Sequence, residues 1–82
     1  MFIEVYVIPT NMWTEPASAS ATKENRKLIA LSCIGDIDYS THCDGRAEIE
    51  YCNGKKTTVV GSYDDIVDRI DKAVLTGKIQ RV

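Results

Sequence analysis

The sequence predicts an α+β fold, in which a small, mainly antiparallel sheet of about three to five strands carries one C-terminal amphipathic helix on one face. Two observations predict this fold class. Asn53 and Gly54 lie between two strand-like runs, and this pair is the strongest short signal for a β-hairpin. Directly after the hairpin, apolar residues recur at helical spacing from Tyr63 onward, behind a residue suited to cap a helix.

The chain before the hairpin divides into four segments of different composition. Residues 1–9 (MFIEVYVIP) have the apolar and β-branched character of a first strand, which Pro9 ends. Residues 10–25 are rich in Ala, Ser, Thr and Asn, and we expect a long exposed loop within the domain. Residues 26–34 (RKLIALSCI) form a nearly continuous apolar run, which predicts a central strand. Residues 35–45 are rich in Asp, Ser and Gly, and predict a short strand or a wide turn.

The hairpin is expected to close through a two-residue loop of type I′, which places Cys52 opposite Lys55 and Ala47 opposite Val60. Because side chains alternate across a strand, this register sorts the hairpin residues onto two faces. The face expected to be buried carries Ala47, Ile49, Tyr51, Thr58 and Val60. The face expected to meet solvent carries Arg46, Glu48, Glu50, Cys52 and Thr57, with Val59 as its aliphatic exception.

The C-terminal helix has recognisable start and stop signals. Ser62 is a good N-cap, and Asp65 stands three residues later, where the acid of a capping box belongs. Gly77 suits the residue that follows a helix, so the predicted helix runs over about residues 63–76. Residues 78–82 (KIQRV) are expected to return as a short extended piece. The predicted apolar stripe is Tyr63, Ile66, Val67, Ile70, Ala73 and Val74.

Length and composition restrict the class of protein. A chain of 82 residues predicts a single domain, 1–82. Because the core of so small a domain gives only marginal stability, we expect a homo-oligomer, which buries further surface. The net charge of −2 argues against a wholly basic nucleic-acid-binding surface, so we expect no double-stranded nucleic acid as partner. The sequence shows neither a membrane span nor a signal peptide, and its three cysteines are an odd number that suggests free thiols. A cytoplasmic location follows as the expectation.

Several residues invite a chemical role. His42 and Cys43, with Cys33 and Cys52, supply zinc-ligand types, but no C-x-x-C spacing occurs. We therefore expect Cys33 in the core, Cys52 on the sheet surface and His42 in a loop, with no metal and no cofactor. A Cys–His nucleophile is the weaker enzymatic interpretation of the same residues, and it lacks an orienting group. The acids Asp36, Asp38 and Asp44 are interpreted as turn residues rather than as cation ligands.

The best candidate for a ligand or partner site combines aromatic and basic residues. Trp13 stands in the polar loop, close in sequence to Lys23, Arg26 and Lys27, and cations near an aromatic ring can hold a phosphate and stack a base. Lys55 and Lys56 form a second basic pair at the hairpin tip. The residues predicted to form the site are Trp13, Arg26, Lys27, Tyr39 and Arg46.

Five segments of the chain resemble a known family. They are MFIEV, LIALSCIGDI, AEIEYCNGKK, TTVV and SYDDIVDRI, and together they cover most of the chain. This order of strands, NGK turn and capped helix resembles the FlbD family of small flagellar and swarming-motility proteins, and a phage-encoded relative fits the same pattern. The resemblance implies a non-enzymatic module and carries over no catalytic residue.

Two functional hypotheses follow, and neither is an enzyme. In the first, the chain is a non-catalytic interaction or regulatory module that self-associates and binds a protein partner through sheet edges and the Trp13 loop. In the alternative, it is a phage-type anti-defence protein that sequesters a nucleotide signal or blocks a bacterial immune factor. That hypothesis places Trp13, Arg26, Lys27 and Arg46 at a subunit interface.

Overall fold

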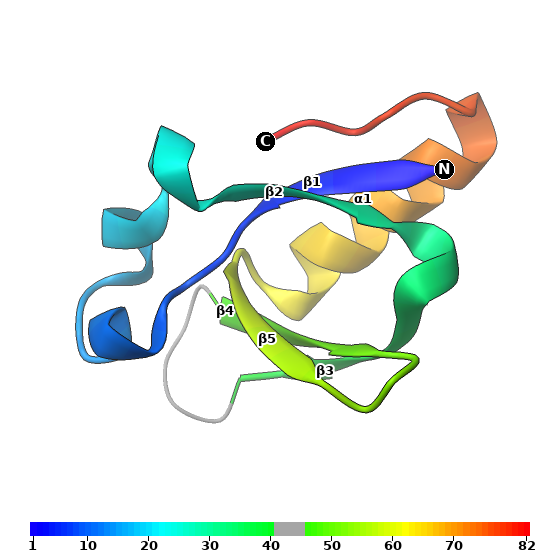
Figure 1. Cartoon of the computed structure of the whole chain (residues 1–82). Helices are drawn as coiled ribbons and strands as arrows, with labels where there is room; N and C mark the ends of the chain where they lie inside the picture. The colour runs from blue at the N-terminus through cyan, green and yellow to red at the C-terminus, as the bar shows by residue number, and fades with distance from the viewer. Residues whose placement is uncertain (41–45) are drawn as a thin grey trace.

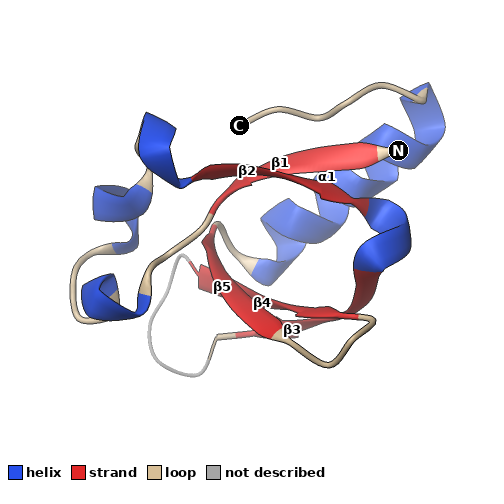
Figure 2. Cartoon of the chain, viewed as in Figure 1, coloured by secondary structure: helices blue, strands red, loops and turns tan. Residues whose placement is uncertain are grey.

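The computed structural model describes residues 1–40 and 46–82 and confirms the α+β class (Figures 1 and 2). Within these residues, five antiparallel strands form two small sheets, and one C-terminal helix packs against them. The elements are β1 (Phe2–Tyr6), β2 (Arg26–Ala30), β3 (Ile34–Tyr39), β4 (Arg46–Tyr51), β5 (Lys56–Val60) and α1 (Tyr63–Thr76).

The two sheets lie one above the other, and α1 runs along one side of the space between them (Figure 1). One sheet has the order β1-β2 and the other the order β3-β4-β5. Just beyond β1, the chain reaches β5: Val7 forms an antiparallel bridge with Val59, and the Ile8 amide donates to the Thr58 carbonyl at 2.8 Å. The enclosed core contains Ile3, Val5, Ile29, Ala47, Ile49, Val59, Ile66 and Ala73.

The long central strand predicted over residues 26–34 is wrong. β2 ends at Ala30, a 3-10 helix covers Leu31–Cys33, and β3 begins at Ile34, so that the chain crosses from one sheet to the other. β2 has only β1 as a strand partner in the described part of the chain, and it is therefore not central. Apolar residues continue through this corner, because Leu31 and Ile34 both pack against the core.

The predicted hairpin register is wrong by one residue. Ala47 pairs with Val59, whereas the prediction, which assumed a two-residue loop, paired Ala47 with Val60. The loop contains three residues, 52–54. Gly54 has a positive φ of 86°, and among the described residues positive φ occurs only at glycines. A type I′ turn needs positive φ at two positions, whereas a three-residue loop needs it once, at its glycine. Val59 is consequently buried with Ala47, and the predicted exception disappears.

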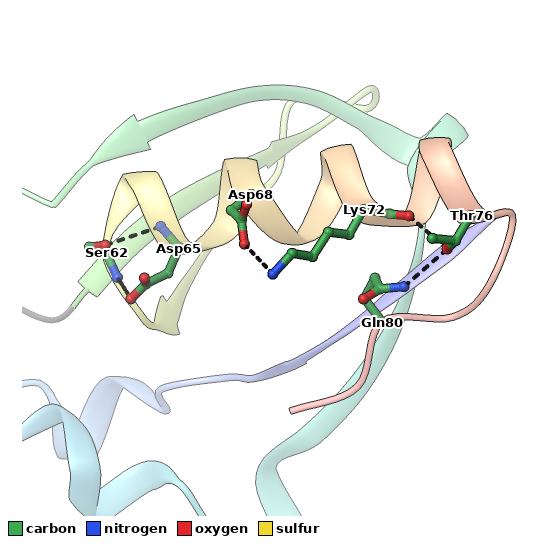
Figure 3. A network of polar contacts seen from close by, with 6 residues as sticks. All are labelled: Ser62, Asp65, Asp68, Lys72, Thr76 and Gln80. Carbon is green, nitrogen blue, oxygen red and sulfur yellow. Dashed lines mark hydrogen bonds and ion pairs between the residues drawn. The ribbon is translucent and has the colours of Figure 1, made fainter.

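The predicted helix, its boundaries and its caps are confirmed. The Ser62 hydroxyl accepts the Asp65 amide at 3.1 Å, and the Asp65 carboxylate accepts the Ser62 amide at 3.2 Å (Figure 3). At the other end Gly77 adopts φ 67°, the left-handed conformation that glycine tolerates best. Ile66 and Ala73 of the predicted stripe are fully buried, whereas Val74 near the C-terminal end is exposed.

Residues 78–82 return as predicted, and the structure shows that they do so along β1 (Figure 1). Gln80 forms a parallel bridge with Ile3, and the Glu4 amide donates to the Gln80 carbonyl at 2.8 Å. Arg81 reaches the Glu4 carboxylate at 3.3 Å, which compensates the charge of a side chain that is largely buried. Gln80 also donates to the Thr76 hydroxyl at 3.3 Å, so the returning segment is attached to α1 as well as to β1 (Figure 3).

The segment between β1 and β2 contains neither a strand nor an α-helix. Three 3-10 helices, Thr10–Met12, Ala17–Ser20 and Lys23–Asn25, fold it into a compact unit beside the sheets (Figure 1). Most of its side chains are exposed, but Ser20 is fully buried, and the Asn25 side-chain amide donates to the Ser20 carbonyl at 3.1 Å.

Candidate functional site

Arg46 fixes the loop that carries Trp13. It begins β4, and its side chain is only 5% exposed. Its guanidinium donates to the carbonyl oxygens of Trp13 and Glu15, so the tip of the loop is held to the hairpin. The prediction that Arg46 meets solvent is wrong, because the loop covers this end of the outer hairpin face. Its Nε is buried without a hydrogen-bond partner among the described residues.

Trp13 lines the same depression as residues on the outer face of β4 and β5. This depression, the Trp13 hollow, is shallow, has a volume of about 300 Å³ and includes Lys56, Glu48 and Thr58 in its lining. The indole is 46% exposed, and the Lys56 ammonium lies 3.6 Å from the Glu48 carboxylate. The cation nearest to Trp13 in this hollow therefore comes from the hairpin rather than from Arg26 or Lys27, and an acid partly neutralises it.

The remaining predicted residues lie in three other places. Tyr39, at the end of β3, stacks on Tyr63 at the start of α1, with ring centroids 4.6 Å apart. Arg26 is exposed at the start of β2, where it pairs with Tyr6 of β1. Lys27 lies with its ammonium 5.5 Å from the centre of the Tyr51 ring. The structure thus joins Trp13 to Arg46 through the loop backbone and leaves the other three apart from them.

A larger depression, the β2 groove, lies between β2 and the tip of the β4–β5 hairpin. Its volume is about 490 Å³, and residues 27–30, 32–33, 51–53 and 55 line it. Lys27 contributes from one wall and Lys55 from the other. Sequence reasoning missed the groove because it interpreted residues 26–34 as one uninterrupted strand, whereas the turn at Leu31–Cys33 folds the chain around the groove's end.

Both described cysteines lie at this groove. Cys33 is exposed, so its predicted place in the core is wrong, because it belongs to the 3-10 corner rather than to a strand. Its carbonyl accepts the Cys52 amide at 2.9 Å, and the Cys52 thiol donates to the Ser32 carbonyl at 3.5 Å. Over residues 1–40 and 46–82, no group of three or more metal-ligating side chains gathers. His42, Cys43 and Asp44 lie outside the described residues.

The outer surface of β1, β2 and the returning tail carries three large apolar side chains, beside the buried Glu4 and the exposed Arg26. Because Ile3 and Ile29 point inward, their neighbours Phe2 and Leu28 point outward, and the bridge between Ile3 and Gln80 aligns Ile79 with Phe2. Phe2, Leu28 and Ile79 are 40%, 44% and 40% exposed. We call these three side chains the apolar face.

Comparisons of the chain with protein-family models, with curated proteins and with solved structures found no match. The resemblance to the FlbD family therefore stays a prediction from the sequence. In the part of the chain that the structure describes, no helix is long and apolar enough to cross a bilayer.

Proposed function

We propose that this protein is a non-catalytic, cytoplasmic interaction module that self-associates and binds a protein partner. The observation that carries the proposal is the apolar face, which places three large apolar side chains on neighbouring extended segments of a small domain. An apolar surface of this kind is typical of a protein–protein contact. The resemblance to FlbD-like proteins also favours a non-enzymatic module.

Self-association would bury the exposed parts of the apolar face. Fully burying a large apolar side chain contributes roughly 1.5–3 kcal/mol, and about 40% of each remains exposed, which leaves about 1 kcal/mol for each residue. A two-fold contact uses the same patch on both copies, so the gain is doubled. The buried Glu4 already has its charge compensated by Arg81, so covering it adds no unpaired carboxylate.

Sedimentation equilibrium tests this part of the proposal. Phe2→Glu and Ile79→Glu each place a charge on the apolar face, and both should lower the association constant at least tenfold. Leu75→Glu is the matched control, because it makes the same change of charge at a residue of α1 that is 84% exposed and lies outside the apolar face. If wild type is monomeric at high concentration, or if all three variants weaken association equally, the proposal fails.

A second candidate, the phage-type nucleotide binder, is favoured by the Trp13 hollow alone. An indole beside a lysine can stack a base and hold a phosphate. The Glu48 carboxylate beside Lys56 opposes an anion there, and for this reason we rank the candidate second. A thermal-shift screen of cyclic and linear nucleotides should give stabilisation that Trp13→Ala removes, whereas no stabilised hit would exclude it.

A further inference from the structure

The edge of β2 that faces away from β1 has no strand partner within residues 1–40 and 46–82. The Leu31 amide donates to the Met1 carbonyl, and the Val7 amide donates to the Asn25 carbonyl, which sets the alternation of the whole ladder. In an antiparallel pair, every second residue directs both its N–H and its C=O toward the partner strand. The intervening residues Leu28 and Ala30 therefore direct theirs away from β1, and no strand of the described chain pairs with them.

That unpaired edge opens into the β2 groove. Residues 27–30 line the groove whereas no residue of β1 does, so the groove lies on the free side of β2. Its far wall is the hairpin tip, where Tyr51 supplies an aromatic surface. The Tyr51 hydroxyl is buried and has no hydrogen-bond partner among the described residues. The groove thus offers backbone hydrogen-bonding groups along one wall and an aromatic ring on the other.

The groove is also positively charged. Lys27 and Lys55 line opposite walls, and no aspartate or glutamate of the described segments contributes to the lining. The ion pairs found within residues 1–40 and 46–82 use Lys56, Lys72 and Arg81, so neither groove lysine is neutralised by a described acid. On a chain of net charge −2, this is a local reversal of sign that selects for a negatively charged partner.

We propose that β2 accepts an acidic, extended peptide segment of a partner protein as an added strand. The peptide backbone would bond Leu28 and Ala30, and its carboxylates would face Lys27 and Lys55. A second copy of this chain fits less well, because the β2 strand that it would add carries two basic residues, Arg26 and Lys27, and no acid. This inference rests on the proposed protein-binding function and names the chemistry of the partner.

The structure provides a variant that blocks only the free edge. Ala30 has φ −70°, which matches the φ of about −65° that proline requires. Its N–H points away from β1, so Ala30→Pro leaves the β1–β2 hydrogen bonds intact and places the proline ring where an added strand would bind. Ala30→Ser keeps the N–H and is the matched control. Circular dichroism establishes that both variants fold.

The test uses a display library of random octapeptides selected against the wild-type chain, followed by fluorescence anisotropy of the most enriched peptide. We expect the enriched peptides to be rich in Asp and Glu. The Ala30→Pro variant and the double variant Lys27→Glu/Lys55→Glu should each bind the peptide at least tenfold more weakly than wild type. The Ala30→Ser variant should bind it as tightly as wild type. Amide exchange at Leu28 and Ala30 should slow when the peptide binds.

Three outcomes would overturn the inference. The first is that the selection enriches no acidic peptides. The second is that the enriched acidic peptides bind the Ala30→Pro variant as tightly as wild type. The third is that no peptide binds and Ala30→Pro loses self-association, which would assign the edge to a second copy. The apolar-face variants separate this failure from failure of the proposed function, because Phe2→Glu and Ile79→Glu leave the lysines and the β2 edge unchanged.

Discussion

Replacement of Arg46 by methionine should release the Trp13 loop. Hydrogen bonds to a charged group contribute about 1.5–3 kcal/mol each, and the guanidinium donates two, to Trp13 and Glu15. The substitution also removes a buried Nε that lacks a partner, an atom whose desolvation costs about 1–3 kcal/mol. Water can reach the freed carbonyls of these exposed residues, so the expected net loss is about 2 kcal/mol.

The single tryptophan makes this loss measurable by two probes. With a urea m-value of about 1 kcal/mol/M for a small chain, the midpoint should fall by about 2 M. Trp13 fluorescence should change at lower urea than the circular dichroism of the sheets, because the loop opens before the core unfolds. Arg26→Met is the control, since Arg26 is exposed. Coincident transitions at the wild-type midpoint would refute the role assigned to Arg46.

Two further predictions concern stability. Val59→Ala should cost about 2–3 kcal/mol, because it removes two buried carbons and leaves a cavity, whereas Val60→Ala should cost less than about 1 kcal/mol. Thermal unfolding followed by circular dichroism distinguishes the two, and the reverse order would mean that the hairpin has the other register. Ser62→Ala should cost about 1 kcal/mol by removing the N-cap, and Ser62→Thr should restore most of it in urea titrations. An unchanged midpoint for Ser62→Ala would contradict the stabilising role of the capping box.

The parts of the fold that local chemistry determines could be predicted. The helix between Ser62 and Gly77 was predicted to the residue, because its cap, its apolar spacing and its terminating glycine all act within a few positions of one another. The hairpin was predicted, but its register was not, because Asn53-Gly54 suits both a two-residue and a three-residue loop. Because Cys52 belongs to the turn, Val59 pairs with Ala47 and lies on the buried face of the hairpin.

The parts that long-range packing determines could not be predicted. No glycine or proline marks the corner at Leu31–Cys33, so one apolar run was interpreted as one strand although its two halves belong to different sheets. Arg46 has the sequence context of an exposed strand residue, and only the folding of the Trp13 loop over it makes it buried. The β2 groove exists because of that corner, and for this reason the site residues could not all be found from sequence spacing.

The parallel bridge between Ile3 and Gln80 has a consequence for synthesis on the ribosome. β1 is translated first, yet its second neighbour becomes available only when Gln80 has left the exit tunnel. Contacts between residues so distant in sequence close late and slow the folding of a small domain. Until then the Glu4 amide lacks its final acceptor, the Gln80 carbonyl, and this edge of β1 stays open to pairing with another chain.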